Sequence, residues 1–384
     1  MIKAVMFDLD NTLLRNPTPE FVAAYVEGVS RFFTARGGAE PGETLRQSVQ
    51  TMMNGPRRIW QSNLELYWEL LHPIWSGTPD ELIHAFNAFY KDDYRALKSN
   101  TAPAPMAGEV IDRVRGAGYK IIIATNPVYP AEAIRHRLAW ADLPSELNYY
   151  DFVTTADNMH FAKPDPAYYA EILARAGLEP DEAVMVGDEP RYDVAASMTI
   201  GMHAYNLTWE TLGALLDLLP AMPTLLPNPI TPEAIIPQWR GNLGALFGTI
   251  SDMPAHFWDQ HPFENEWSPL EIVCHLRDYE ASVQRARLMR ILNEDNPFIA
   301  QSPQPAAPGQ MDDCAGDGLA VAHCFLEERL KTIEFVERLT TEDWQRPARH
   351  SVFGPTTMLE MAYFTAQHDR LHLRQLCQTI GGCE

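Results

Sequence analysis

The sequence predicts two domains of different class: an α/β domain built on a parallel sheet, and an all-α four-helix bundle. In residues 1–219, short apolar segments that end in polar residues alternate with helical periodicity, which is typical of a parallel sheet covered by helices. Residues 233–384 instead show four helical segments. The intervening residues 220–232 are expected to form an extended, semi-rigid linker, because their proline density excludes a regular helix. These prolines are Pro220, Pro223, Pro227, Pro229 and Pro232.

The first predicted strand ends in a pair of carboxylates. Residues 2–7 form a run that is apolar except for Lys3, and Asp8, Asp10 and Thr12 follow directly. Side chains two residues apart share one side of a strand, so a backbone extended past Phe7 would place both carboxylates at the strand's carboxyl end, where α/β sheets bind ligands. Adjacent carboxylates repel each other unless a cation lies between them or one is protonated. The pair suits a divalent cation and a phosphorylated ligand; the alternative is a polar turn that only ends the strand.

A helical insertion separates this strand from the rest of the sheet. Residues 15–101 carry apolar side chains at helical spacing, for example Phe21, Tyr25 and Val29. Glycine-containing segments divide the pattern, which indicates four short helices. The α/β pattern resumes after Pro103.

The second predicted strand also ends in polar groups. Residues 119–124 are followed by Thr125 and Asn126, and hydroxyl and backbone N–H groups at a strand end suit phosphate oxygens. Taken singly, this segment is an ordinary turn signal. A further strand is expected at residues 152–154.

Two further segments place charged residues near strand ends. Lys163 begins a stiff Lys-Pro-Asp-Pro segment before a predicted helix at residues 167–176. A solvated loop lysine is the alternative for this position. The strand predicted at residues 183–186 continues into a glycine followed by Asp188, and Asp193 is expected at the start of the next helix.

In this order the segments resemble the four motifs of the haloacid dehalogenase-like (HAD) superfamily. The motifs are hhhhDxDxT at Asp8, Asp10 and Thr12, the strand end at Thr125, KPxP from Lys163, and GDxxxxD from Gly187 to Asp193. The resemblance covers about residues 1–219. It implies a Rossmannoid parallel sheet in which the insertion at about residues 15–101 is a helical cap that closes over the site and sets substrate choice.

The resemblance implies a hydrolase, specifically a Mg²⁺-dependent phosphatase that acts on a small phosphorylated metabolite through an aspartyl phosphate. Asp8 would be the nucleophile, and Asp10 would protonate the leaving oxygen and then activate water. The residues implied to bind the phosphoryl group are Thr12, Thr125, Asn126 and Lys163, and those implied to hold Mg²⁺ are Asp8, Asp10 through its carbonyl, Asp188 and Asp193. The alternative within the superfamily is a haloacid dehalogenase, whose chemistry needs neither Mg²⁺ nor the second aspartate, so Asp10 and Thr12 favour phosphate.

Four helices are predicted in the second domain. Cap signals, such as Ser268 three residues before Glu271, mark where several of them begin. The predicted helices span about residues 231–250, 268–292, 318–339 and 357–380. The long Pro-rich segment before the third helix indicates a bundle with at least one long connection.

Three histidines of this domain form a candidate metal site. His368 and His372 are four residues apart, so both imidazoles lie on one face of a helix, and His275 lies within the second helix. Core histidines with polar partners are the alternative that spacing alone leaves open. The Trp267-Ser-Pro-x-Glu-x-x-x-His-Leu segment and the late His-Asp-x-x-His resemble the DinB/YfiT-like metal-binding bundles. This resemblance implies a three-histidine site for Zn²⁺ or Ni²⁺, and a module that acts as a metal-binding sensor or a thiol-dependent transferase.

Composition limits the partners and the location. The net charge of −21 is shared between both halves, which argues against unassisted binding of nucleic acid or of an anionic membrane. No signal peptide is expected, and a homo-oligomer is compatible with the sequence. The five cysteines have irregular spacing, so no disulfide framework is expected and a cytoplasmic location fits.

Overall fold

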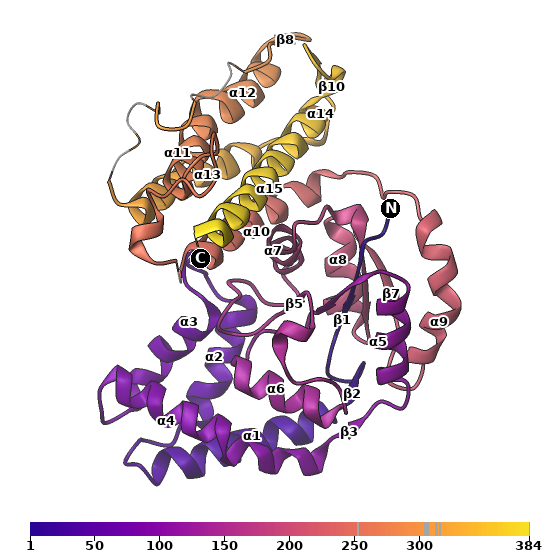
Figure 1. Cartoon of the computed structure of the whole chain (residues 1–384), viewed down its shortest axis with the longest axis vertical. Coiled ribbons are helices and arrows are strands. Elements are labelled where there is room, and N and C mark those ends of the chain that lie inside the picture. The colour runs from indigo at the N-terminus through magenta and orange to yellow at the C-terminus, as the bar shows by residue number, and fades with distance from the viewer. Residues whose placement is uncertain (252, 303–306, 312–313, 315, 384) are drawn as a thin grey trace. The chain divides into compact units, whose positions relative to one another are not determined.

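The computed structural model describes residues 1–384 except 252, 303–306, 312–313, 315 and 384 (Figure 1). The chain divides into two compact units, Met1–Asn228 and Pro229–Glu384. Across the described residues, every helix is too short or too polar for a membrane span.

The first unit is built on a five-stranded parallel sheet, which confirms the predicted α/β class. In spatial order the strands are β5 (Phe152–Val153), β4 (Lys120–Ile123), β1 (Ala4–Phe7), β6 (Ala183–Gly187) and β7 (His203–Asn206). The central strand β1 is entirely buried, as expected for a strand with neighbours and helices on all sides. Phe7 is in register with Ile123 of β4 and Val186 of β6. The residues that follow these three strands therefore meet at one edge of the sheet.

Helices follow the strands, and the insertion forms the predicted cap of four α-helices (Figure 1). The cap contains α1 (Thr18–Thr34), α2 (Gly42–Asn54), α3 (Asn63–Leu71), η1 (His72–Ile74), α4 (Pro79–Lys91) and η2 (Asp93–Asn100). The sheet carries α5 (Ala107–Gly116), α6 (Ala131–Trp140), η3 (Leu147–Tyr149), α7 (Ala167–Ala176), η4 (Pro180–Glu182), the π-helix η5 (Pro190–Ala195) and α8 (Ala196–Thr199).

Capping and aromatic packing explain why the cap folds. Ser62 and Thr78 form capping boxes that begin α3 and α4. Inside the cap, the hydroxyl of Tyr25 lies 2.8 Å from that of Tyr90 and 3.1 Å from that of Tyr67, so these buried polar groups are satisfied among aromatic rings. A two-stranded antiparallel sheet that the sequence did not predict, β2 (Leu14–Arg15) with β3 (Ala102–Pro103), joins the two connections between cap and sheet.

The predicted linker begins inside helical structure. After β7 the chain forms η6 (Leu212–Ala214), α9 (Leu215–Leu218) and η7 (Leu219–Thr224). Pro220 occupies the first turn of η7, where a missing N–H leaves no hydrogen bond unmade, and Met222 is buried. The proline count was therefore a poor guide to the start of the linker.

The second unit is helical and also contains a small sheet. Its helices are α10 (Pro232–Ile250), η8 (Ala255–Phe257), α11 (Pro269–Tyr279), the π-helix η9 (Glu280–Arg285), α12 (Ala286–Asn293), α13 (Gly318–Val336), α14 (Thr341–Trp344) and α15 (Met358–Cys383). The unpredicted sheet contains β8 (Phe298–Ile299), β9 (Pro347–His350) and β10 (Gly354–Thr357). Pro355 made strand β10 hard to predict, because proline lacks the backbone N–H that pairs with a neighbouring strand. The structure tolerates this proline because β10 is an edge strand.

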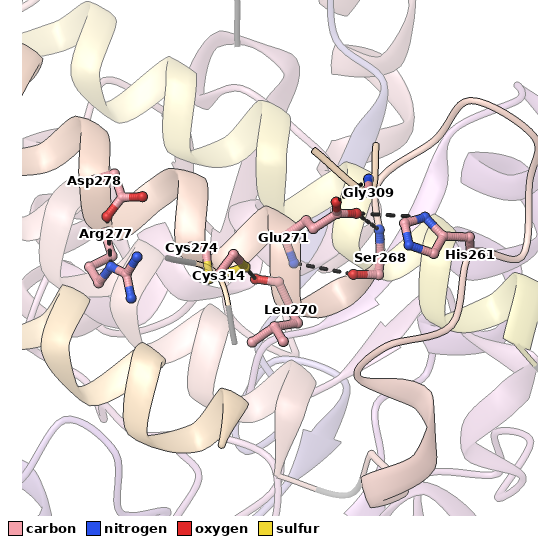
Figure 2. Close-up of a disulfide and its surroundings, with 9 residues drawn as sticks. All are labelled: His261, Ser268, Leu270, Glu271, Cys274, Arg277, Asp278, Gly309 and Cys314. Atoms are coloured by element: carbon pink, nitrogen blue, oxygen red, sulfur yellow. Dashed lines mark hydrogen bonds and ion pairs between the residues drawn. A yellow bond between two sulfur atoms is a disulfide. The ribbon is translucent and has the colours of Figure 1, made fainter. Parts of the chain in front are cut away.

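One pair of cysteines is bonded, although the sequence predicted no disulfide framework. Cys274 of α11 is bonded to Cys314, with Cα atoms 5.9 Å apart and a sequence separation of 40 (Figure 2). Earlier in the same connection, the N–H of Gly309 donates to Glu271 Oε1 of α11 at 2.6 Å. Spacing could not reveal this pair, because only the fold of the loop brings the two sulfur atoms together. The remaining cysteines, Cys324, Cys377 and Cys383, are free.

Candidate active site and candidate metal centre

The carboxyl edge of the parallel sheet gathers the predicted catalytic residues. Asp8 follows β1, Thr125 follows β4, and Asp188 follows β6. All three line one cavity of about 500 Å³ between the sheet edge and cap helices α1 and α2. Lys163 lines the same cavity, and its Nζ donates to Asp8 Oδ1 at 2.7 Å. Segments more than a hundred residues apart in sequence therefore meet at Asp8.

Lys163 is held in place by a buried carboxylate on α7. Glu171 accepts hydrogen bonds from the backbone N–H groups of His160 at 3.0 Å and Phe161 at 3.2 Å, and its Oε1 lies 2.7 Å from His160 Nδ1. These contacts fix the loop immediately before Lys163. Although burial lowers it, the carboxylates of Asp193 and Asp8 raise the pKa of Lys163 well above its usual value, so the ammonium group stays charged.

Asp193 anchors the other side of Lys163. Its Oδ1 accepts from Lys163 Nζ at 2.6 Å and its Oδ2 accepts from the N–H of Glu189 at 3.1 Å. Gly187 permits this arrangement, because a Cβ atom there would collide with the carboxylate of Asp193. Asp193 lies within the π-helix η5 rather than at the start of a regular helix. The missing side chain at Gly187 therefore leaves room for the carboxylate of Asp193 at the end of β6.

Three carboxylates crowd together at this edge. One oxygen each from Asp8, Asp188 and Asp193 lies within 4.8 Å of the other two. Burial raises the pKa of Asp8 well above its usual value, against the opposing effect of Lys163, and Asp193 and Asp188 raise it further. Burial also raises the pKa of Asp188 to about 7, with added repulsion from Asp193 and Glu189. Clustered carboxylate oxygens that repel each other are the donors that Mg²⁺ prefers, so these residues fit the ion.

Asp10 has its own partners, which the motifs did not reveal. Its Oδ2 accepts from Arg137 Nη1 at 2.9 Å and its Oδ1 accepts from Asn16 Nδ2 at 2.8 Å. The buried guanidinium lies 4.2 Å from the ring centroid of Tyr129 and 4.8 Å from that of Phe21. Although burial lowers it, Asp10 raises the pKa of Arg137, so the guanidinium stays charged. Nothing in the sequence singled out Arg137, because its contact with Asp10 depends on how α6 packs.

The chain does not remain extended through the first motif. The N–H groups of Leu13 and Leu14 both donate to the carbonyl of Leu9, and Asn11 takes a left-handed conformation with φ of 58°. This turn places Thr12 in the interior, where it is fully buried and does not line the cavity. Its Oγ1 has no hydrogen-bond partner among the described residues. Thr12 was expected to bind substrate, whereas in the structure its side chain is buried by the turn after Leu9 and does not line the cavity.

The second motif contributes two residues to the cavity wall. Thr125 is buried, and its carbonyl accepts from Thr154 Oγ1 and Tyr168 Oη, both at 2.7 Å, which fixes the end of β4. Asn126 is half-buried. Its Oδ1 is buried without a hydrogen-bond partner within the described chain, and the residue lines the cavity.

The three predicted histidines of the second unit also converge. One ring nitrogen from each of His275, His368 and His372 lies within 4.8 Å of the other two. The Nε2 atoms of His275 and His368 are 3.3 Å apart. Two nitrogens bound to tetrahedral Zn²⁺ at about 2.0–2.1 Å would be separated by about 3.3 Å, so the spacing fits a shared ion.

Burial keeps these imidazoles neutral. It lowers the pKa of His275 and of His368 to about 3, and His372 adds to the effect at both positions. His372 Nδ1 lies 3.0 Å from Gln375 Oε1, a contact that leaves Nε2 as the acceptor nitrogen. The ring of Trp267 lies 4.8 Å from that of His275 and shields the cluster. Neutral, oriented imidazoles are the form that transition metals bind.

Comparison with known proteins assigns both units. Residues 2–197 match the family model described as haloacid dehalogenase-like hydrolase, and residues 238–376 match that of the DinB superfamily. Pyrophosphatase PpaX of Bacillus velezensis is 26% identical over 213 residues, which cover 56% of this chain and 86% of that protein. A phosphoglycolate phosphatase of Nitrosospira multiformis is 28% identical over 207 residues, covering 53% and 82%. The crystal structure of an HAD phosphatase from Thermococcus onnurineus is 23% identical, covering 57% of this chain and 98% of that chain with a TM-score of 0.37.

Proposed function

The chain belongs to the haloacid dehalogenase-like hydrolase family, as its motifs predicted, and on this premise we propose that it is a Mg²⁺-dependent phosphatase of small phosphate monoesters. It also carries the predicted DinB superfamily domain, at residues 238–376. One observation supports the phosphatase most directly: Asp8 lines the cavity with Lys163 Nζ at 2.7 Å and the carboxylate of Asp188 beside it. The names of the curated relatives, a pyrophosphatase and a phosphoglycolate phosphatase, agree with chemistry at phosphorus.

The proposed reaction has two displacements at phosphorus. A carboxylate oxygen of Asp8 attacks the phosphoryl group, the bond from phosphorus to the ester oxygen breaks, and Asp10 gives that oxygen its proton. Asp10 then takes a proton from water as the water oxygen attacks the aspartyl phosphate, which releases inorganic phosphate and restores Asp8. Because Arg137 and Asn16 each hold one oxygen of Asp10, they orient its carboxyl group for both proton transfers.

Charge balance depends on Lys163 and a cation. Lys163 neutralises Asp8 and the phosphoryl oxygens, and Thr125 and Asn126 provide polar contacts to the same oxygens. Asp8, Asp188 and the carbonyl of Asp10 would hold Mg²⁺, with Asp193 supporting them. Bound there, the ion supplies the positive charge that lets an anionic carboxylate approach an anionic phosphoryl group.

Removal of divalent ions tests this proposal. We expect a chelator to lower phosphate release from an aryl phosphate by roughly a hundredfold or more, because several kcal/mol of charge stabilisation is lost, and we expect Mg²⁺ to restore it. Phosphate release is measured after chelation and again after Mg²⁺ is added. Phosphate release that the chelator does not change would contradict the Mg²⁺ dependence, and chelator-insensitive release of halide from a 2-haloacid would support the alternative, haloacid dehalogenase-type chemistry.

For the second unit we propose a transition-metal site at His275, His368 and His372, holding Zn²⁺ or Ni²⁺ with an open position. The 3.3 Å separation of two Nε2 atoms supports it. Such a site would serve a metal sensor or a thiol-dependent transferase, with a thiolate or water as the remaining ligand.

Elemental analysis tests the metal site. We expect about one transition-metal ion per purified chain, and loss of most of it in His368→Ala, because two imidazoles bind far more weakly than three. His256→Ala is the matched control, since His256 is exposed and outside the cluster. A protein without transition metal, in both the unmodified chain and the variant, would contradict the site and leave a purely structural cluster.

A further inference from the structure

We infer that the cavity above Asp8 selects phosphate monoesters whose alcohol part is apolar and uncharged, an inference that rests on the proposed phosphatase function. Pyrophosphate, phosphoglycolate and sugar phosphates would be poor substrates by comparison. Two features of the cavity support this assignment: its lining is mostly apolar, and its cationic side chains are paired with carboxylates.

Most of the surface that lines the cavity is apolar. Cap helices α1 and α2, together with the loop after β4, contribute its aliphatic side chains: Val22, Val26, Leu45, Val49, Met53 and Val128. The buried rings of Phe21 and Tyr129 extend the same surface. An alkyl or aryl group would leave water on entering this space. Sugar hydroxyls would lose hydrogen bonds to water, and the cap helices offer them only the polar groups of Thr18, Tyr25, Arg46 and Gln50 in exchange.

Every cation that lines the cavity has a carboxylate partner. Lys163 is bonded to Asp8 and Asp193, and Arg137 is bonded to Asp10. Arg46 is the remaining cation of the described lining, and it pairs with Glu43 at 3.0 Å. The side chain of Arg46 is also 61% exposed, so it lies at the rim in contact with water.

A second anionic group on the substrate would therefore lack a counter-ion inside the cavity. The carboxylates of Asp10, Asp188 and Glu189 line the same cavity and add like charge to it when ionised. Burying a charge without a partner is costly, and repulsion adds to the cost. The same wall that accepts an alkyl chain thus rejects a carboxylate or a second phosphate.

The test is a comparison of kcat/KM across one homologous series. Ethyl, butyl and hexyl phosphate would be assayed with Mg²⁺ beside phosphoglycolate, inorganic pyrophosphate and glucose 6-phosphate. We expect kcat/KM to rise about fourfold per added methylene until the cavity is filled. The value for hexyl phosphate should exceed the values for phosphoglycolate, pyrophosphate and glucose 6-phosphate. Asp8→Asn provides the blank for every substrate.

The outcomes separate this inference from the proposed function. Asp8-dependent turnover that is fastest with phosphoglycolate, pyrophosphate or glucose 6-phosphate would overturn the inference and leave the phosphatase intact. Absence of Asp8-dependent turnover with all six compounds would overturn the phosphatase itself, and the inference with it.

A charge placed in the wall gives a second readout. In Val49→Arg, we expect the ratio of kcat/KM for phosphoglycolate to that for hexyl phosphate to rise at least tenfold, because a cation replaces an apolar contact. Gln47→Arg is the control: it adds the same charge to the same helix at an exposed position outside the cavity lining, and its ratio should not change. An unchanged ratio in a folded Val49→Arg would overturn the role of this wall, and the series on the unmodified chain decides the inference even if that variant does not fold.

Discussion

Replacing Asp8 by Asn should reduce phosphate release at least about a thousandfold, the scale of loss seen when a nucleophile is removed from an active site that acts as a unit. The amide lacks the negative charge that attack at phosphorus requires. The fold should survive, because Lys163 keeps its 2.6 Å contact to Asp193 when the charge of Asp8 is removed. We therefore expect an unchanged thermal transition with activity at background.

The measurement is single-turnover and steady-state phosphate release from an aryl phosphate at saturating Mg²⁺. Asp112→Asn makes the same chemical change at an exposed position of α5 and should retain full activity. Hydrolysis by Asp8→Asn at the rate of Asp112→Asn would place the nucleophile elsewhere and end the proposed mechanism.

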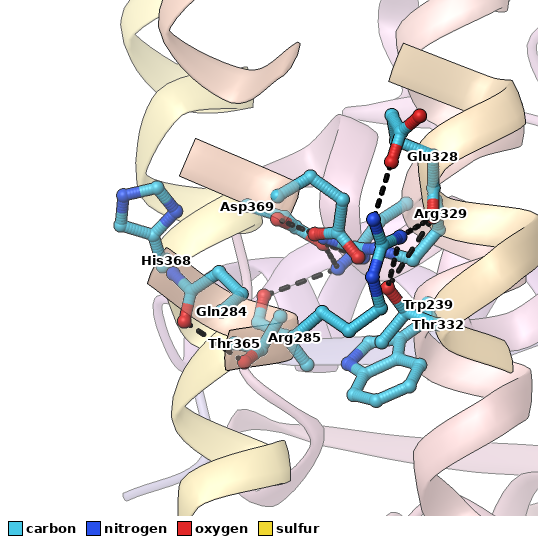
Figure 3. Close-up of polar contacts among 12 residues, drawn as sticks. Trp239, Gln284, Arg285, Glu328, Arg329, Thr332, Thr365, His368 and Asp369 are labelled. Carbon is cyan, nitrogen blue, oxygen red and sulfur yellow. Dashed lines mark hydrogen bonds and ion pairs between the residues drawn. The ribbon is translucent and has the colours of Figure 1, made fainter. Parts of the chain in front are cut away.

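The second large effect is expected from Arg329→Met in the helical unit. Arg329 lies in the bundle core with only 1% of its side chain exposed (Figure 3). Its guanidinium donates to both carboxylate oxygens of Asp369, at 2.5 and 3.0 Å, and to Glu280 Oε2 at 2.6 Å. Methionine would leave two buried carboxylates without a counter-ion, so we expect a loss of about 3–5 kcal/mol in the free energy of unfolding.

Calorimetry of the full chain checks this value, and the transition of the helical unit should fall by roughly 10 °C. Arg338→Met is the matched control, because the pair it forms with Glu334 is exposed and should be worth less than about 1 kcal/mol. Adding Glu280→Gln and Asp369→Asn to Arg329→Met should recover part of the loss, since the unpaired charges disappear. A decrease no larger than that of Arg338→Met would contradict the importance of this network.

The sequence was most informative where a motif follows a buried strand. A parallel sheet aligns the carboxyl ends of its strands, so the order of the strand-end residues was enough to predict that Asp8, Thr125 and Asp188 share one edge. The periodicity of the helices likewise predicted that His368 and His372 share a face. In each case the relevant contact follows from regular backbone geometry.

Residues that act through irregular packing were missed. Arg137 is one helical residue among many until α6 brings it to Asp10, and Asn16 depends on the turn after Leu9. Thr12 shows the converse, because a conformational detail of the same turn moved an expected ligand-binding hydroxyl into the interior.

The amino-acid sequence by itself determined the two fold classes, the four motifs and the three histidines, because these follow from local periodicity and from the types of residue at strand and helix ends. Only the tertiary structure decided which side chains hold Asp10, that Cys274 meets Cys314, and that the cations of the cavity are already paired. These are contacts between segments distant in the chain, and their free energies depend on burial and on the charges nearby, which no local pattern encodes.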